Sequence, residues 1–435
     1  MTHLHSWGKI PSSTPSAIIN LDNRHQSLEK SESSVLAVGN LRSYGDEVYN
    51  DNGVIFNCQP LNKFIAFDRV NGYLTAECGI TFEQILQLIV PCGWFLPATP
   101  GTQYVTLAGA IANDVHGKNH HACGSFGCFV EEFELVRSNG ERFICSKQEN
   151  ENYYYASIGG MGLTGWMSWA KIKLLSITNS AMITNAYKFS HLQEFFELNA
   201  DLEKRHTYTV TWIDCLAKKK NLGRGILFTG EHAGYLEHVP PRKKGKLSVP
   251  FSPPFSFINQ LTLKAFNTAY YHRPISSGTR IIHYEPFFYP LDNIQNWNRL
   301  YGKKGFYQYQ CVVPMDIAYD AIKELLTLIS AKKMGSFLIT LKTFGSISSG
   351  GLLSFPRPGA TLALDFANEG EKTLNLFAEL DKVVLAAKGA LYPAKDARMS
   401  AEMFECGYPA LNEFIKYIDP QFNSNLWQRV FRSHS

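Results

Sequence analysis

The sequence predicts an α+β fold made of two domains, on three observations. The chain has 435 residues, 45% of them hydrophobic and 18% charged, which is typical of an ordered protein large enough to divide into more than one domain at roughly 150 residues each. Short strand patterns surround a glycine-rich stretch in the first half. Strand-then-helix units recur in the second half, which indicates a domain built around a sheet.

The first half alternates short strands with one well-marked helix. Strands are expected over residues 34–39, 54–57, 64–68, 73–78 and 169–174, and in a hairpin formed by 132–136 and 142–145 around Asn139 and Gly140. Thr81 followed by Gln84 is a capping box, in which each side chain bonds the other residue's backbone at a helix start. Apolar residues then repeat at helical spacing, before a proline and a glycine end the helix: Phe82, Ile85, Leu86, Ile89, Pro91 and Gly93.

The composition changes near residue 178, and the second half has its own pattern. Residues 207–214 alternate as a strand, and two strand-then-helix units follow: 306–313 with a helix over 316–330, and 361–366 with a helix over 371–388. Asp316 is expected as the N-cap of the first helix and Gly389 as the C′ residue of the second.

The stretch Leu96–Gly127 is the strongest functional feature of the sequence. Its glycines stand at 101, 109, 117, 124 and 127. Glycine lets backbone N–H groups approach a ligand closely, and runs of such groups can hold a pyrophosphate. The glycine fingerprint of a Rossmann site is absent, so a dinucleotide would need another scaffold.

This stretch and four further blocks resemble one family of flavoproteins. The blocks are Arg42–Asp46, Gly159–Gly165, Gln308–Gln310 and Leu391–Arg398, in the family's order. Together they are similar to FAD enzymes of the vanillyl-alcohol-oxidase type, which have a PCMH-type FAD-binding domain, and among these to the flavin subunits of decaprenylphosphoryl-ribose epimerases. The resemblance implies an FAD-binding domain over 1–178, made of two α+β subdomains and completed by 390–435. It also implies a substrate domain over 179–389, built on an antiparallel sheet.

The resemblance implies an activity as well. The expected reaction is FAD-dependent oxidation of a secondary alcohol of a sugar, namely the 2-hydroxyl of a polyprenyl-phosphate-linked ribose, to give the 2-keto sugar. This would be the first half of an epimerisation, with a short-chain dehydrogenase as partner. Two alternatives stay open: an aldonolactone or alditol oxidase acting on a free sugar, and a flavin-binding partner subunit without turnover.

The family's functional residues transfer to matching positions of this sequence. The expected FAD contacts are Arg42, Ser43, Tyr44, Gly45, Asp46, Gly101, Thr106, Leu107, Ala108, Gly109, Asn113, Asp114, Val115, His116, Gly117, Met167 and Tyr392. The expected substrate contacts are Lys118, Trp212, Gln308, Gln310, Lys342, Ala363 and Lys395. The residues expected to act in catalysis are Tyr44, Lys118, Gln310 and Lys395, and burial of such lysines would lower their pKa. Ala363 and Thr361 depart from the family pattern, where a cysteine and an asparagine stand, so the pocket beside the flavin is expected to differ.

Arg42 bears on how the cofactor is held. Many relatives attach FAD covalently to a histidine at this position, and arginine cannot form that bond, so non-covalent FAD is expected.

No metal is expected. Gly117 and Asn119 disfavour a helix that would bring the nearby histidines together, and the spacing of two cysteines in the same stretch does not suit zinc. The histidines are His116, His120 and His121, and the cysteines are Cys123 and Cys128.

Charge and composition exclude other classes of protein. A net charge of +4 is too small to indicate nucleic-acid binding, and nine cysteines without paired spacing do not form a disulfide framework. No signal peptide or membrane-spanning run is visible, so a cytoplasmic protein is expected, with peripheral contact at the inner membrane.

The segment 236–257 supports that membrane contact. It carries a basic cluster followed by phenylalanines: Arg242, Lys243, Lys244, Lys246, Phe251, Phe255 and Phe257. The segment is either a lid that meets phosphate and lipid at a membrane surface or a solvated linker.

Overall fold

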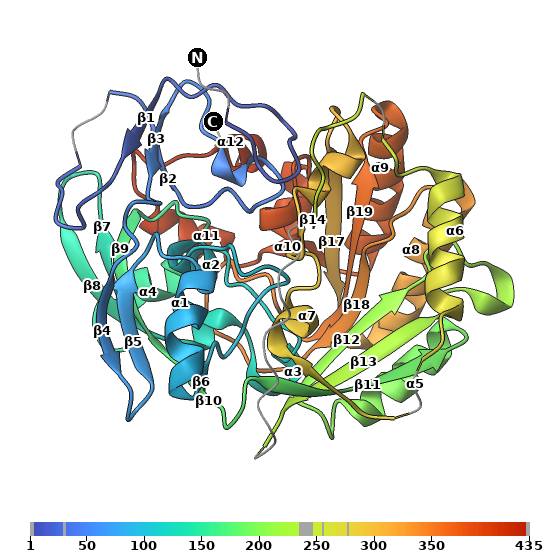
Figure 1. Ribbon diagram of the computed structural model, residues 1–435. Coiled ribbons are helices and arrows are strands. Elements are labelled where there is room, and N and C mark those ends of the chain that lie inside the picture. The colour runs from blue at the N-terminus through green and yellow to red at the C-terminus, as the bar shows by residue number, and fades with distance from the viewer. Residues whose placement is uncertain (1–3, 29–31, 235–246, 255, 276–277, 432–435) are drawn as a thin grey trace.

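The computed structural model describes residues 4–28, 32–234, 247–254, 256–275 and 278–431. Figure 1 shows two halves packed side by side, each with its own large sheet. Every strand pairing in these two sheets is antiparallel, and helices lie beside both, so the predicted α+β fold is confirmed. None of the helices in the described ranges is long and apolar enough to cross a membrane.

The first half contains two sheets. Five antiparallel strands lie in the order β4-β5-β9-β7-β8, with bounds β4 (Phe64–Asp68), β5 (Tyr73–Glu77), β7 (Val130–Val136), β8 (Arg142–Ser146) and β9 (Trp166–Lys173). Three parallel strands lie in the order β1-β3-β2, with bounds β1 (Ala17–Asn20), β2 (Val35–Val38) and β3 (Val54–Asn57). The predicted strands of this half are confirmed, whereas β1 was not predicted. All four residues of β1 are exposed, so their sequence lacks the apolar alternation of a buried strand.

The predicted capping box is confirmed at helix α1 (Phe82–Ile89). The Thr81 amide donates to Gln84 Oε1 at 2.9 Å, and the Gln84 amide donates to Thr81 Oγ1 at 3.3 Å. The apolar side of α1 packs into the core of this half. The other helices here are α2 (Leu107–Ala112), α3 (His120–Cys123) and α4 (Glu151–Ser157), and the short pair β6 (Trp94–Phe95) and β10 (Leu175–Ser176) lies beside them.

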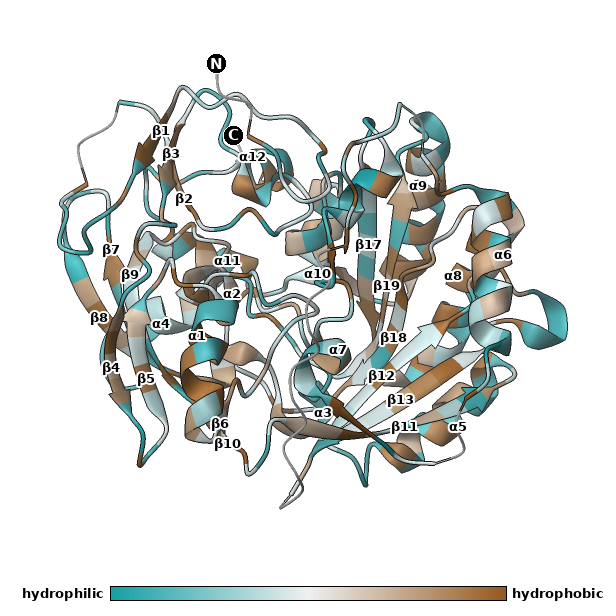
Figure 2. Ribbon diagram, viewed as in Figure 1, coloured by the Kyte–Doolittle hydropathy of each residue, from teal (hydrophilic) through white to brown (hydrophobic). Residues whose placement is uncertain are grey.

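The second half is built on eight antiparallel strands in the order β15-β11-β13-β12-β18-β19-β17-β20. Their bounds are β11 (Ala181–Phe189), β12 (Tyr208–Ile213), β13 (Gly225–His232), β15 (Arg280–His283), β17 (Phe306–Val313), β18 (Ile339–Phe344), β19 (Gly359–Ala367) and β20 (Ala390–Leu391). The helices are α5 (Leu192–Leu202), α6 (Gln260–His272), α7 (Tyr284–Phe288), α8 (Ala318–Lys332) and α9 (Glu371–Ala386). In Figure 2, apolar residues, in brown, recur along the strands, and the loops are mostly teal or white.

Both predicted strand-then-helix units are confirmed, as β17 with α8 and β19 with α9, but both predicted caps are wrong. Asp316 lies inside a 3-10 turn (Met315–Ile317), and Ile317 is the N-cap of α8. The left-handed residue after α9 is Lys388, with φ +50°, rather than Gly389. Gly389 has a different role, since a Cβ there would lie 2.4 Å from the Val312 carbonyl oxygen.

The C-terminal segment crosses back to the first half, drawn in red in Figure 1. β20 pairs with β17, and the chain then forms α10 (Ala401–Gly407), α11 (Leu411–Phe414) and α12 (Asn425–Val430). The Val35 amide donates to the Gln421 carbonyl at 2.8 Å, and the Asn425 amide donates to the Tyr49 carbonyl at 2.8 Å. The domain boundaries themselves, 1–178 with 390–435 and 179–389, stay a prediction.

The segment 236–257 falls largely outside the described residues, which omit 235–246 and 255. The basic cluster is therefore not described. In the described part, β14 (Leu247–Ser248) pairs in parallel with β16 (Ile294–Gln295). The side chains of Leu247, Phe251 and Phe257 are exposed.

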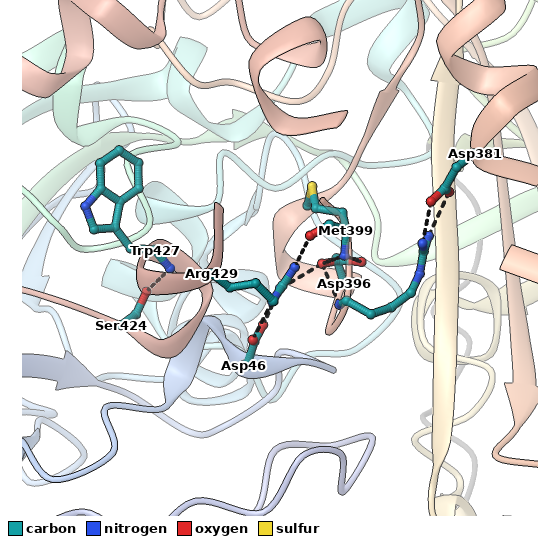
Figure 3. Close-up of polar contacts among 8 residues, drawn as sticks. Asp46, Asp381, Asp396, Met399, Ser424, Trp427 and Arg429 are labelled. Atoms are coloured by element: carbon teal, nitrogen blue, oxygen red, sulfur yellow. Dashed lines mark hydrogen bonds and ion pairs between the residues drawn. The ribbon is translucent and has the colours of Figure 1, made fainter. Parts of the chain in front are cut away.

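One arginine joins the returning C-terminal segment to the first half, as Figure 3 shows. Arg429, on α12, donates from Nη2 to Asp46 Oδ1 at 2.8 Å and to Asp396 Oδ2 at 2.9 Å. It also donates from Nε to Asp46 Oδ2 at 3.0 Å and from Nη1 to the Met399 carbonyl. Both carboxylates are buried, so a single guanidinium compensates two charges that water does not reach.

Replacing Arg429 by alanine is expected to destabilise the protein strongly. Removing one partner of a buried charge pair costs about 3–5 kcal/mol, because the carboxylates then stay buried without the guanidinium, and Asp396 keeps only the amide donors of Arg398 and Met399. The apparent melting temperature, measured by circular dichroism, should fall by several degrees or more. Arg205→Ala is the control, because its ion pair with Asp201 is exposed and such pairs contribute about 0–1 kcal/mol. An equal fall in melting temperature for the two variants would show that the contacts of Arg429 stabilise the protein no more than an exposed ion pair does.

Candidate active site

A large cavity lies between the two halves of the molecule. Its volume is about 1420 Å³, and its walls include the Arg42–Tyr44 segment, the glycine-rich stretch and one face of the eight-stranded sheet. Ligand pockets are usually about 300–1,000 Å³, so this cavity has room for a large cofactor and a second molecule together.

The structure brings nearly all of the predicted site residues together in the walls of this cavity. The predicted cofactor contacts found there are Arg42, Ser43, Tyr44, Gly101, Thr106, Ala108, Gly109, Asn113, Val115, His116, Gly117, Met167 and Tyr392. All predicted substrate contacts are found there: Lys118, Trp212, Gln308, Gln310, Lys342, Ala363 and Lys395. Residues far apart in the sequence therefore share one cavity, whereas their direct contacts with ligands stay a prediction.

Four predicted cofactor residues lie behind the wall instead: Gly45, Asp46, Leu107 and Asp114. Gly45 packs so closely that a Cβ there would lie 1.5 Å from the Asp396 carbonyl oxygen. Asp46 is held by Arg429, and Leu107 is fully buried in the core. These four residues do not line the cavity, and their contact with the cofactor stays a prediction.

Asp114 supports the glycine-rich stretch. Its carboxylate is fully buried and accepts hydrogen bonds from the Ser125 hydroxyl at 2.8 Å, the Ser349 hydroxyl at 2.6 Å and the Gly127 amide at 2.7 Å. These bonds join the end of the stretch to a loop of the second half. Burial raises the pKa of Asp114, and the hydrogen bonds oppose that shift.

Three half-buried lysines project into the cavity. Lys118 Nζ donates to the Phe287 carbonyl and lies 4.6 Å from the centroid of the Phe287 ring. Lys342 Nζ is 2.9 Å from His116 Nδ1 and donates to the Gly117 carbonyl at 3.0 Å. Lys395 Nζ lies 3.9 Å from the centroid of the Tyr44 ring. Among the described residues, the three ammonium groups contact only neutral groups and aromatic rings.

The surroundings lower the pKa of all three lysines. Burial lowers the pKa of Lys118 to about 7, and burial with the charges of Lys118 and Lys395 lowers the pKa of Lys342 to about 7. Burial lowers the pKa of Lys395 to about 8, against the opposing effect of Asp365 and Glu47. Each amine can therefore exchange a proton near neutral pH, which makes these residues candidates for acid–base chemistry.

Two buried carboxyl groups in the cavity walls were not predicted from the sequence. Glu47 accepts a hydrogen bond from the Ser43 hydroxyl, and Asp365 accepts one from Gln308 Nε2. Burial raises the pKa of each to about 7. Glu47 follows Arg42–Asp46 directly, so the same block could have suggested it. Asp365 lies in an ordinary strand pattern that carries no such indication.

Strand register places the polar groups of the second half on one face. In the pairing of β17 with β19, Gln308 lies opposite Asp365 and Gln310 opposite Ala363, and in the pairing of β18 with β19, Lys342 lies opposite Thr361. Gln310 Nε2 donates to Thr361 Oγ1 at 3.3 Å and is 3.0 Å from His116 Nε2. Burial and the nearby Lys342 charge lower the pKa of His116, so this ring is neutral near pH 7.

The histidines of the glycine-rich stretch do not gather around a common point. His120 packs against the Phe344 ring, and His121 Nε2 is 2.9 Å from the His206 carbonyl oxygen. Within the part of the chain that the structure describes, no group of three or more histidine, cysteine, aspartate or glutamate side chains could hold a metal ion. The expectation that the protein uses no metal stays a prediction.

The residues of the first half fit a dinucleotide. Apart from its two neighbours in the chain, none of the described residues has an atom within 4 Å of the position that a Cβ would occupy at Gly101, so a ligand can approach the backbone there. Arg42 lies between two rings, its guanidinium carbon 4.5 Å from the centroid of Trp7 and 5.1 Å from that of Tyr104. Its Nε is buried without a hydrogen-bond partner among the described residues, which leaves a donor for an anionic ligand.

Comparison with known proteins agrees with this geometry. An FAD binding domain family matches residues 23–146. Decaprenylphosphoryl-beta-D-ribose oxidase of Mycolicibacterium smegmatis is 32% identical over 452 residues, which cover 98% of this chain and 97% of that protein. An uncharacterized protein of Streptomyces coelicolor is 29% identical over 369 residues, 81% of this chain and 100% of that protein. Human Delta(24)-sterol reductase is 28% identical over 115 residues, 26% of this chain and 22% of that protein.

The first of these similarities extends over nearly the whole of both chains, and the FAD-binding match falls on the half that contains the glycine-rich wall of the cavity. This chain therefore belongs to the family of FAD-dependent oxidoreductases, with a PCMH-type FAD-binding domain, that includes decaprenylphosphoryl-beta-D-ribose oxidase.

Proposed function

We propose that this protein oxidises a secondary alcohol of a sugar, namely the 2-hydroxyl of a polyprenyl-phosphate-linked ribose, to the 2-keto sugar. The observation that supports it best is the group of three lysines on the wall of a cavity large enough for FAD and substrate together. Bound FAD would supply the hydride acceptor. The residues that would hold it are Arg42, Ser43, Tyr44, Gly101, Gly109 and His116, and the attachment is non-covalent because Arg42 replaces the attaching histidine.

In this proposal, one of the three lysines accepts a proton and the other two bind phosphate. Lys395, over the Tyr44 ring, has a pKa of about 8, so its neutral amine can accept the proton of the substrate hydroxyl. Lys118 and Lys342 supply positive charge for a phosphate, because each is a compact cation exposed to the cavity. A bound phosphate would raise the pKa of both and keep them charged.

An apolar arm of the same cavity favours a lipid-linked sugar over a free sugar. This arm is the group of apolar side chains that β12, β13 and α6 contribute to the cavity lining: Val210, Trp212, Phe228, Phe266 and Tyr270. The Arg273 guanidinium lies over the Phe228 and Tyr270 rings. The Phe266 and Tyr270 rings stack with their centroids 5.5 Å apart. A free pentose has no group to fill this arm, whereas a prenyl chain would remove its surface from water.

The alternatives have less support. An aldonolactone or alditol oxidase would need no apolar arm, and a partner subunit without turnover would have no need for three lysines with lowered pKa values. Thr361 and Ala363 depart from the family pattern beside the flavin: Ala363 presents only a methyl group, and Thr361 accepts a hydrogen bond from Gln310. These differences limit the proposal to the class of substrate, a lipid-linked sugar. A short-chain dehydrogenase that reduces the keto sugar, and peripheral contact with a membrane that holds the lipid, complete the proposal.

Non-covalent FAD gives a direct test. Precipitating the yellow protein with acid should release all of the flavin into the supernatant, because Arg42 cannot form the bond that a histidine forms in relatives. The measurement is the absorbance of supernatant and pellet, with mass spectrometry of the precipitated chain. A chain that carries the mass of FAD would contradict the prediction.

Lys395→Ala should keep the protein folded and yellow but slow flavin reduction by substrate about 10²–10⁴-fold, since positioned acid–base groups contribute about that much. The rate is measured by anaerobic stopped-flow absorbance. Lys416→Ala is the control, because Lys416 is an exposed lysine of the same C-terminal segment. An unchanged rate in Lys395→Ala would remove Lys395 from the mechanism.

The pH dependence tests the same residue. The amine accepts a proton only when neutral, so the wild-type reduction rate should rise as the pH rises through about 8 and then level off. This rise should be absent from Lys395→Ala. A wild-type rate that falls above pH 8 would show that the ammonium form is the active one.

Phe266→Ala tests the apolar arm. Full burial of an exposed phenylalanine contributes about 1.5–3 kcal/mol, and Phe266 is 42% exposed, so the variant should raise the KM for a long-chain prenyl-phosphate ribose about 3- to 10-fold. Ribose 1-phosphate, which lacks the chain, should show little change. Phe64→Ala is the control, because Phe64 is as exposed as Phe266, 42% for each, and does not line the cavity. Equal effects of Phe266→Ala on both substrates would show that the arm does not hold the chain.

A further inference from the structure

Asp365 occupies a special place in the cavity wall. It lies on β19, directly opposite Gln308 of β17, and only 1% of its surface is exposed. It nevertheless lines the cavity. The charged or titratable groups that act on it come from three other segments: Lys395, Tyr44 and Tyr301.

The two oxygens of this carboxyl group differ. Oδ1 accepts a hydrogen bond from Gln308 Nε2, whereas Oδ2 is buried and has no hydrogen-bond partner among the described residues. An unsatisfied buried acceptor costs about 1–3 kcal/mol, and more when the group is charged. Such a group in a cavity wall indicates that a ligand supplies the missing donor.

Asp214 shows what a purely structural aspartate of the same sheet looks like. It directly follows β12 and is 3% exposed. Its Oδ2 accepts from Arg224 Nη2 at 2.8 Å, and its Oδ1 accepts from Asn267 Nδ2 at 3.0 Å. Asp214 does not line the cavity, and both of its oxygens have partners.

The neighbours of Asp365 in the described part of the chain do not bond Oδ2. Lys395 lies over the Tyr44 ring and forms no ion pair with Asp365 there. The Tyr301 hydroxyl is buried and forms no hydrogen bond with Asp365 among the described residues. A movement of this hydroxyl could satisfy Oδ2 from within the protein, and a Tyr301→Phe variant distinguishes that alternative from a ligand.

We propose that Asp365 recognises the sugar: Oδ2 accepts a hydrogen bond from a ribose hydroxyl while Gln308 holds Oδ1 and orients the carboxylate. The proposal rests on the proposed function, because it takes a sugar as the ligand. A site built to bond a hydroxyl rejects an analogue that lacks it, because the buried acceptor is then left unpaired. Asp365 therefore determines which polyhydroxyl group enters beside Lys395.

The test uses the holoenzyme and farnesyl-phosphate-linked β-D-ribose, with its 2-deoxy, 3-deoxy and 5-deoxy analogues. The Kd of each compound is measured for wild type and for Asp365→Asn. Calorimetry gives the Kd of the 2-deoxy analogue, which has no 2-hydroxyl to oxidise. For the parent and the other two analogues, the Kd is taken from the concentration dependence of anaerobic flavin reduction, which separates binding from the limiting rate.

The measurements are made at about pH 8.5, above the pKa of about 7 that burial gives Asp365, so that its carboxyl group is ionised. Asp365→Asn should then weaken the parent and two of the analogues about 10- to 150-fold, the range expected for a hydrogen bond to a charged group. The remaining analogue, which lacks the bonded hydroxyl, should bind both proteins equally. Asp214→Asn, the matched control, should leave every Kd unchanged. An equal loss for all three analogues, or no loss for any, would overturn the proposal.

Two further measurements identify the group that Oδ2 bonds. FAD also carries hydroxyl groups, so a rise in the Kd of FAD in Asp365→Asn, with sugar binding unchanged, would assign the contact to the cofactor and overturn the proposal. Tyr301→Phe should leave the sugar affinities intact, and a loss equal to that of Asp365→Asn would overturn the direct contact.

Failure of the proposed function is distinguishable from failure of this proposal. If no compound reduces the flavin, calorimetry measures all four Kd values. The expected pattern of losses would then show that the proposed function fails while recognition by Asp365 stands.

Discussion

The contact of Arg429 with Asp46 and Asp396 is the constraint on which the site depends. Asp46 ends the segment that carries Tyr44, and Asp396 directly follows Lys395, so one guanidinium fixes both segments relative to each other. The Tyr44 amide donates to the Ala394 carbonyl at 2.9 Å beside this contact. Lys395 is thereby held against the Tyr44 ring without an ion pair of its own in the described structure. One cation and two carboxylates behind the cavity wall thus determine the position of one amine inside the cavity.

Burial changes the pKa values of the ionisable groups in the cavity more than contacts between charges do. Lys118, Lys342 and Lys395 have lowered pKa values and Glu47 and Asp365 have raised ones, and desolvation is the largest cause in every case. Groups of both signs are therefore brought toward neutrality near pH 7. Ligands that fill the cavity will displace water, which strengthens these effects unless a ligand brings a charge of its own. This arrangement suits a reaction that moves a proton from a substrate hydroxyl.

The register of the eight-stranded sheet determines which side chains meet the ligand. Alternate residues of a strand point to opposite faces, so Gln308 and Gln310 of β17 face the same side as Thr361 and Asp365 of β19. A shift of one residue in either strand would turn its two residues toward α8 and α9. The helices that cover the far face of the sheet therefore protect the site, since they bury the other set of side chains and so lock the register.

The local features of this protein follow from its amino-acid sequence. The capping box of α1, most strands, the glycine-rich stretch and the family could be predicted, because each depends on residues close together in the chain or on blocks in a fixed order. The folded chain alone reveals that Asp114 and Asp46 support the wall, that Asp316 caps no helix, and that Asp365 faces the cavity. Burial and pairing give these residues their roles, and both arise from segments far apart in the sequence: Asp46 is compensated by α12, and Asp365 gains its neighbours from three separate segments. No local pattern records such contacts, because the free energy of a buried charge depends on everything that surrounds it.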